Sequence, residues 1–164
     1  KQVDIMRKHP NVGFCFTGAR IFDAVTDSWT TWNADRSGFE PGMISSGKYC
    51  LWTMFGKNPY EYPRSEFWQM TATFLVRAIV LKMAAERYEI FKWRLSVGDA
   101  TFCLGAGSLS DVCYLEDETA VYRSTASGVT RTSGSKCGLD TLIVRSFFLR
   151  RHFRLCFSRS ESSE

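Results

Sequence analysis

The amino-acid sequence predicts an α/β protein with a mixed sheet. Segments rich in β-branched and aromatic residues alternate with segments whose apolar residues recur every three to four positions, which favours strands interleaved with helices. The chain has 164 residues, of which 45% are hydrophobic and 23% charged, a balance typical of a folded domain. The formal net charge of +4 is mild and does not imply nucleic acid as a partner, so none is predicted.

The first half of the chain is predicted to begin with the end of a helix at residues 1–8. Pro10 stops this helix, because proline cannot continue the hydrogen-bond ladder. Apolar β-forming residues at 12–16 and 19–24 predict one strand or two short ones. Polar and small residues at 27–46 predict a long loop, of the kind that serves as a lid or binding segment. The composition of residues 48–55 is compatible with a helix.

In the second half, residues 69–76 are the clearest strand and residues 77–88 the clearest helix, with Ile79, Val80, Met83 and Ala84 on one face. A short helix is expected from Asp99 to residue 106, terminated by the glycine at 107. Two short strands follow at 111–115 and 119–123, then a flexible loop at 124–137. Residues 139–157 predict a long amphipathic helix, and the tail is expected to fray.

Cysteine spacing and hydropathy indicate the compartment. The six cysteines include no C-x-x-C pair, which favours free thiols in a reducing compartment over a secreted disulfide framework. No apolar run approaches the roughly 20 residues of a membrane-spanning helix, and no signal peptide is apparent. We therefore expect a cytoplasmic protein. The chain opens inside a helical pattern without an initiator methionine, so we also expect it to be a piece of something longer.

Asp99 is the most informative single residue. It follows a glycine at a loop-to-helix junction with aromatic residues close by, and a helix amino terminus favours the ionised carboxylate. An accessible carboxylate can take a proton from a sugar hydroxyl as that hydroxyl attacks. The alternative is that Asp99 only caps its helix, which is a common role for aspartate.

Four segments, taken in order, resemble the second half of the family-2 glycosyltransferases, which build bacterial polysaccharide and lipopolysaccharide chains. KQVD at 1–4 and KHPNVGFCFTG at 8–18 are similar to the helix and strand that follow the family's metal-binding carboxylates. TATFLVR at 71–77 is similar to the strand facing the acceptor, and LSVGD at 95–99 to the loop with the catalytic carboxylate. VCYLEDETAVYR at 112–123, with GVT at 128–130, is similar to the hairpin and loop that follow. The resemblance covers residues 1–130.

This resemblance implies the acceptor-side, C-terminal half of a GT-A fold, spanning residues 1–137. The implied reaction is inverting transfer of a sugar from a nucleotide-diphosphate donor to a hydroxyl of a glycan or lipid-linked acceptor, with Asp99 as the general base. Without the donor-binding half, the fragment is expected to be inactive alone. The substrate-binding residues that we expect are Trp93, Arg94, Arg123, Thr71 and Thr73.

Two of these residues have a stated chemistry and an alternative. Trp93 can stack on a sugar ring, although core packing is the commoner use of tryptophan. Arg123 can form bidentate contacts with a diphosphate, although it can equally be a surface arginine at a strand end.

The resemblance also implies a divalent cation, Mg²⁺ or Mn²⁺, in the complete enzyme. Its ligands are expected outside this chain, because the chain contains no D-x-D motif. Asp23, Asp27 and the acidic run at 116–118 are interpreted as solvated structural carboxylates. Thr125 stands where relatives often carry a histidine, which puts a metal role for that loop in doubt because threonine is a poor transition-metal ligand.

The end of the chain supports a second hypothesis. Residues 138–158 are predicted to form a basic amphipathic helix and residues 159–164 a disordered tail; five arginines fall within the last twenty residues, counting from Arg145. Such a helix can lie on an anionic membrane surface, at the inner face of the membrane, or dock on another part of the protein. The alternative function is therefore a non-catalytic peripheral membrane or partner-binding module.

Overall fold

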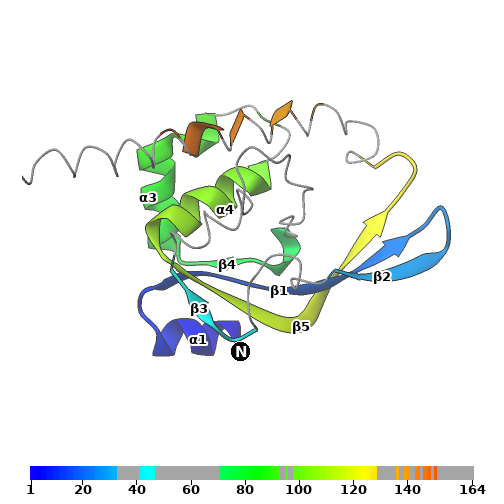
Figure 1. Cartoon of the computed structure of the whole chain (residues 1–164), viewed down its shortest axis with the longest axis horizontal. Coiled ribbons are helices and arrows are strands. Elements are labelled where there is room, and N and C mark those ends of the chain that lie inside the picture. The colour runs from blue at the N-terminus through cyan, green and yellow to red at the C-terminus, as the bar shows by residue number, and fades with distance from the viewer. Residues whose placement is uncertain are drawn as a thin grey trace, which may run out of the picture.

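The computed structural model describes residues 1–32, 41–46, 71–92, 95 and 98–128, together with residues 136, 139, 140, 143, 144, 146–148 and 150. In this part of the chain a mixed open sheet of five strands lies between helices (Figure 1). The strand order is β2-β1-β5-β3, and β4 also pairs with β1. The predicted α/β class with a mixed sheet is confirmed.

Two long strands form the centre of the sheet. β1 (Val12–Asp23) and β5 (Asp111–Ser124) run parallel along almost their whole lengths. The residues predicted as strands at 111–115 and 119–123 are confirmed as strand, but they form one continuous strand, so the break between them and the hairpin implied for this segment are wrong. The polar residues between those two stretches form a bulge in β5, and pairing with β1 resumes beyond it.

Three shorter strands complete the sheet. β2 (Ser28–Trp32) is antiparallel to the second half of β1, β4 (Leu75–Val76) is antiparallel to its first half, and β3 (Ile44–Ser45) is antiparallel to β5. β2 and β3 fall within the loop predicted at 27–46, so that prediction is wrong for these residues. The run SWTTW consists largely of aromatic and β-branched residues and forms a strand despite its polar flanks.

One face of the sheet packs against α3 (Ala78–Tyr88), the 3₁₀ turn η3 (Ile90–Lys92) and α4 (Gly98–Leu109), which lie above it in Figure 1. α3 buries the line Val80, Ala84 and Tyr88, whereas Ile79 and Met83 are exposed. The predicted helix is confirmed, but its inward face is rotated from the prediction. α4 also continues past the glycine at 107 to Leu109, so the predicted helix end is wrong.

The contact between α3 and α4 explains this rotation. A Cβ built at Gly105 of α4 would lie 3.2 Å from the Cβ of Ala84. The two small residues therefore let the helix backbones approach closely, and the line of α3 that contains Ala84 faces inward. A pattern of apolar residues in one helix does not reveal a small residue in its neighbour.

The opposite face of the sheet is covered by α1 (Gln2–Lys8), which confirms the helix predicted at 1–8. Met6 of α1 is buried in a second, smaller core on this face, and Ile5 packs against it. The Gln2 amide donates to the backbone oxygens of Thr73, at 2.9 Å, and Cys15, at 3.4 Å. α1 is therefore held by side-chain hydrogen bonds as well as by apolar packing.

The strand predicted at 69–76 is wrong for most of its described residues. Thr71–Thr73 form a 3₁₀ turn, η2, in which the N–H of Phe74 donates to the oxygen of Thr71 at 3.1 Å. Only Leu75 and Val76 pair with β1. Threonine favours strands through its branched side chain, but here the chain turns before it reaches the sheet.

The described residues of the C-terminal segment lie against the main core. Val144 and Phe148 are at most 2% exposed, and the ring centroid of Phe148 is 4.8 Å from that of Tyr88 on α3. The described helical residues from 139 to 150 agree with the predicted amphipathic helix, whereas Lys136 is helical within the loop predicted at 124–137, so that prediction is wrong for Lys136. The remainder of the predicted helix to residue 157 and the tail lie outside the described residues.

Candidate functional site

Asp99 lies in the first turn of α4, and its side chain is half-buried. Its Oδ1 atom accepts a 2.8 Å hydrogen bond from the backbone N–H of Ala100. Burial raises the pKa of the Asp99 carboxyl group, although backbone hydrogen bonds act in the opposite direction. A carboxylate with a raised pKa is a stronger base than an exposed aspartate.

The direction of α4 places this residue along the sheet. α4 leads directly into β5 and runs back over the sheet against the direction of that strand (Figure 1). Its 12 residues rise about 18 Å, the length of about five strand residues. Counted from the start of β5 at Asp111, the amino end of α4 therefore reaches roughly the level of residues 115–117, where β5 bulges.

At the bulge, residues 116–119 of β5 stand opposite the single residue Gly18 of β1, between the pairs Thr17–Leu115 and Ala19–Ala120. A Cβ at position 18 would lie 3.0 Å from the backbone oxygen of Glu116. Glycine therefore permits a close backbone approach that a larger residue would disturb. The bulge ends the buried part of the sheet on the side of Asp99.

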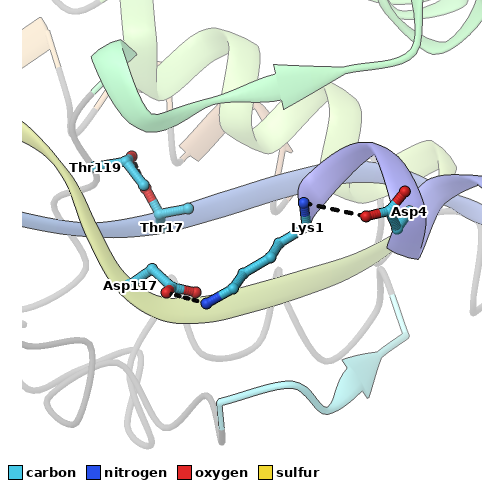
Figure 2. A network of polar contacts seen from close by, with 5 residues as sticks. All are labelled: Lys1, Asp4, Thr17, Asp117 and Thr119. Atoms are coloured by element: carbon cyan, nitrogen blue, oxygen red, sulfur yellow. Dashed lines mark hydrogen bonds and ion pairs between the residues drawn. The ribbon is translucent and has the colours of Figure 1, made fainter.

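Polar side chains from β1, β5 and α1 gather at this point (Figure 2). The hydroxyl oxygens of Thr17 and Thr119 are 2.5 Å apart. The side-chain Nζ atom of Lys1 lies 2.5 Å from Oδ1 of Asp117 on β5. The backbone amino nitrogen of Lys1 lies 3.3 Å from Oδ2 of Asp4. The hydrogen bond and charge of Asp117 raise the pKa of the Lys1 side chain. These contacts link the start of α1 to the bulge.

Three of the acidic residues interpreted as structural have structural contacts. Asp117 pairs with Lys1, and Glu118 lies 3.8 Å from Arg20. Asp23 accepts hydrogen bonds from the N–H groups that follow it in the turn between β1 and β2, the first at 2.9 Å. Within the described residues, no three histidine, cysteine, aspartate or glutamate side chains are grouped to hold a metal ion.

Thr71 and Thr73 are positioned by η2, not by a strand. Thr71 is exposed, whereas Thr73 is 3% exposed and its backbone oxygen accepts from Gln2 of α1. Thr73 therefore has a packing role that the sequence did not reveal. Thr71 is the one of the two whose exposure suits contact with a substrate.

Of the other three predicted binding residues, only Arg123 is among the described residues. Trp93 and Arg94 lie outside the described residues. Arg123 is exposed near the end of β5, opposite Phe22, about four strand residues or roughly 13 Å beyond the bulge. In the part of the chain that the structure describes, no interaction joins Arg123 to Asp99.

Arg77 is the principal residue that the sequence analysis missed. Its Nε atom donates to the oxygen of Val12 at 2.8 Å, and its guanidinium also donates to the backbone oxygens of Met6 and His9. It thus ties the end of α1 to the start of β1. The sequence shows an arginine between a predicted strand and a predicted helix. It does not show which backbone atoms the long side chain of this arginine contacts.

The described helices include none that is both long and apolar enough to cross a bilayer. In the C-terminal segment, Leu139 and Ile143 are exposed, whereas Val144 and Phe148 belong to the main core. At least part of the apolar face of this segment therefore contacts the protein itself.

No protein-family model matches the chain, and no curated protein matches it.

Proposed function

We propose that this chain is the acceptor-side part of an inverting glycosyltransferase of the GT-A type. It serves transfer of a sugar from a nucleotide-diphosphate donor to a hydroxyl of a glycan or lipid-linked acceptor, with Asp99 as the general base. The observation that supports this most is the half-buried Asp99 carboxylate at the amino end of α4, whose pKa burial raises.

The proposed chemistry is a single displacement. The acceptor oxygen attacks the anomeric carbon of the donor, the nucleoside diphosphate leaves with the electrons of the broken bond, and Asp99 takes the proton of the acceptor hydroxyl. The hydrogen bond from Ala100 orients the carboxylate. Partial burial makes the carboxylate more basic and so favours proton transfer.

The position of the site supports the same proposal. In open α/β sheets, ligands commonly bind outside the carboxyl ends of the strands. The amino end of α4 and the bulge are both displaced towards those ends of the buried parallel strands. Thr71, exposed on the neighbouring turn η2, is the described candidate for contact with the acceptor. A divalent cation at the donor diphosphate stays part of the proposal, with ligands outside this chain.

The decisive experiment measures sugar transfer in the longest natural form of the protein, with a panel of radiolabelled nucleotide sugars. Asp99→Asn is expected to lower turnover by about 10²–10⁴-fold, the usual contribution of a general base, and to leave donor affinity nearly unchanged. Asp27→Asn is the matched control, because Asp27 lies in an exposed turn with φ 52°, which asparagine tolerates. Full turnover in Asp99→Asn would remove the base assignment.

The pH profile gives an independent check. A base acts only when deprotonated, so turnover should rise with pH through the raised pKa of Asp99 and then level off. The acidic limb should lie above the range of an exposed aspartate, about pH 4. If turnover instead rose with pH at or below that range, the result would contradict a role for the half-buried carboxylate.

A further inference from the structure

Cys15 and Cys113 are direct neighbours on the two central strands. They are paired in register on β1 and β5, which run parallel, so their side chains project from the same face of the sheet. Adjacent strands lie about 4.8 Å apart, and disulfides join Cα atoms separated by roughly 4.4 to 6.8 Å. The backbone is therefore already within disulfide range, and only the sulfur atoms need to approach.

The two thiols lie in the same core and are shielded from water. Both residues are 0% exposed. Interaction with Cys113, followed by burial, raises the pKa of Cys15, and interaction with Cys15 lowers the pKa of Cys113. Cys113 is thus the thiol of the pair that ionises first.

The pair lies beneath α1, in the smaller core. Met6 of α1 is buried against the two cysteines, and the other members of this core are apolar. α1 has 7 residues, and the Gln2 amide holds its first turn to the backbone oxygens of Thr73 and Cys15. A helix this short has little stability of its own, so movement of α1 offers a route by which a reagent reaches the sulfur atoms.

Cys103 provides the contrast within the same molecule. It is also a buried cysteine outside any disulfide, 5% exposed, but it lies on α4 in the main core. It belongs to a different core from the pair and is not covered by α1. Burial alone therefore does not distinguish the pair; the second thiol in register does.

We propose that Cys15 and Cys113 form a reversible disulfide site that a small-molecule disulfide oxidises when α1 moves away. The Cys113 thiolate attacks the reagent, forms a mixed disulfide and releases one reagent thiol. The Cys15 sulfur then attacks the mixed disulfide and releases the second thiol. The two cysteines lose two electrons and two protons and gain one S–S bond, and the reagent is reduced to two thiols. The product is a covalent link between the two central strands.

The test treats the reduced full chain with oxidised glutathione, alkylates the remaining thiols and maps the peptides by mass spectrometry. The expected result is a cross-linked peptide pair containing Cys15 and Cys113, lighter than the reduced pair by two hydrogens, and cleaved by dithiothreitol. Cys103 should react more slowly than the pair. In Cys15→Ala and Cys15→Ser, which guard against a folding defect in either one, Cys113 should form no link to position 15 and should instead retain glutathione.

Gln2→Ala tests the role of α1. Loss of its hydrogen bonds should speed formation of the link by about fivefold, the factor that corresponds to one ordinary hydrogen bond. Val3→Ala is the matched control on the same helix, because Val3 is 49% exposed, and it should leave the rate nearly unchanged. The proposal is overturned if Cys15 and Cys113 are recovered only as separate alkylated or glutathionylated residues, or if Gln2→Ala does not change the rate of linking.

Discussion

The two halves of the central strands differ sharply although they belong to the same pair. In β1, residues 12–19 are buried, whereas the residues after them are half-buried or exposed; β5 changes in the same way at its bulge. The first halves, which we call the inner sheet, lie between α1 on one face and α3 and α4 on the other. The second halves, with β2, form what we call the outer ribbon, which extends away from the helices in Figure 1.

This difference shows what each half depends on. The inner sheet is stabilised by burial on both faces, with Phe14 and Phe16 on one side and Cys15 on the other. The outer ribbon is held by strand pairing and by exposed side-chain contacts. The ring centroids of Trp29 and Phe22 are 4.9 Å apart, and the Arg20 guanidinium lies over the Trp29 ring. Contacts of this kind contribute about 0.2–1 kcal/mol each, much less than a fully buried aromatic residue.

The largest expected effect separates one phenylalanine in each half. Phe14→Ala in the inner sheet should lower the free energy of unfolding by about 3–5 kcal/mol, because a fully buried ring leaves a cavity. Phe22→Ala in the outer ribbon removes a half-buried ring and should cost about 1 kcal/mol. Urea unfolding followed by circular dichroism measures both. Equal losses would mean that the outer ribbon is as tightly packed as the inner sheet.

A second test uses glycines. A Cβ at Gly13, in the inner sheet, would lie 2.5 Å from the Cβ of Ser110 and 2.6 Å from Cγ2 of Val80. Gly13→Ala should therefore cost about 3 kcal/mol through overpacking. At Gly98, at the start of α4, a Cβ meets nothing within 4 Å, so Gly98→Ala should be neutral or stabilise by up to about 1 kcal/mol. Thermal unfolding compares the two, and an unharmed Gly13→Ala variant would contradict the close packing of α3 on β1.

The third test asks whether the C-terminal segment belongs to the inner half. Val144→Ala should cost about 2 kcal/mol, because Val144 is 0% exposed in the main core. Ile143→Ala is the matched control, since Ile143 is 47% exposed, and should change stability by less than about 0.5 kcal/mol. Flotation with anionic vesicles, using both variants, addresses the membrane alternative: weaker vesicle binding in Ile143→Ala alone would assign the exposed face to lipid.

The smallest expected effect is on the pH dependence of stability. The pKa of Asp99 is higher in the folded state than in the unfolded chain, so the folded state binds more protons between the two values. Stability contributed by this residue should therefore fall as the pH rises from about 4 through the folded pKa. The Asp99→Asn variant should lack that decline, which urea unfolding at a series of pH values measures. An identical pH dependence in both proteins would mean that burial of Asp99 has no energetic effect.

Much of the fold could be predicted from the sequence, because local patterns decide much of it. The mixed α/β class, α1 and α3 follow from helical periodicity and from runs of β-forming residues. The errors arise where tertiary partners decide. The inward line of α3 depends on Gly105 of the neighbouring helix, and the threonines of η2 turn although their side chains favour strands.

The candidate site was predictable only in part. Its carboxylate could be proposed at the start of a helix, and Asp99 stands there. The burial of Asp99 and the separation of Arg123 from Asp99 depend on how far β5 continues past the bulge. The run at 116–118 looks like a hairpin turn in sequence, because acidic residues are common in turns. Nothing in it shows that the parallel neighbour β1 continues alongside.

The number of residues in the bulge also decides which face of the outer ribbon each later side chain of β5 occupies. Successive side chains of a strand point to opposite faces, so adding or removing one residue between positions 115 and 120 would reverse the face on which every later side chain of β5 stands. Arg123 and Tyr122 would then exchange sides. A change of two residues would restore the original faces. Variation in the length of this segment should therefore be tolerated in even steps and rejected in odd ones.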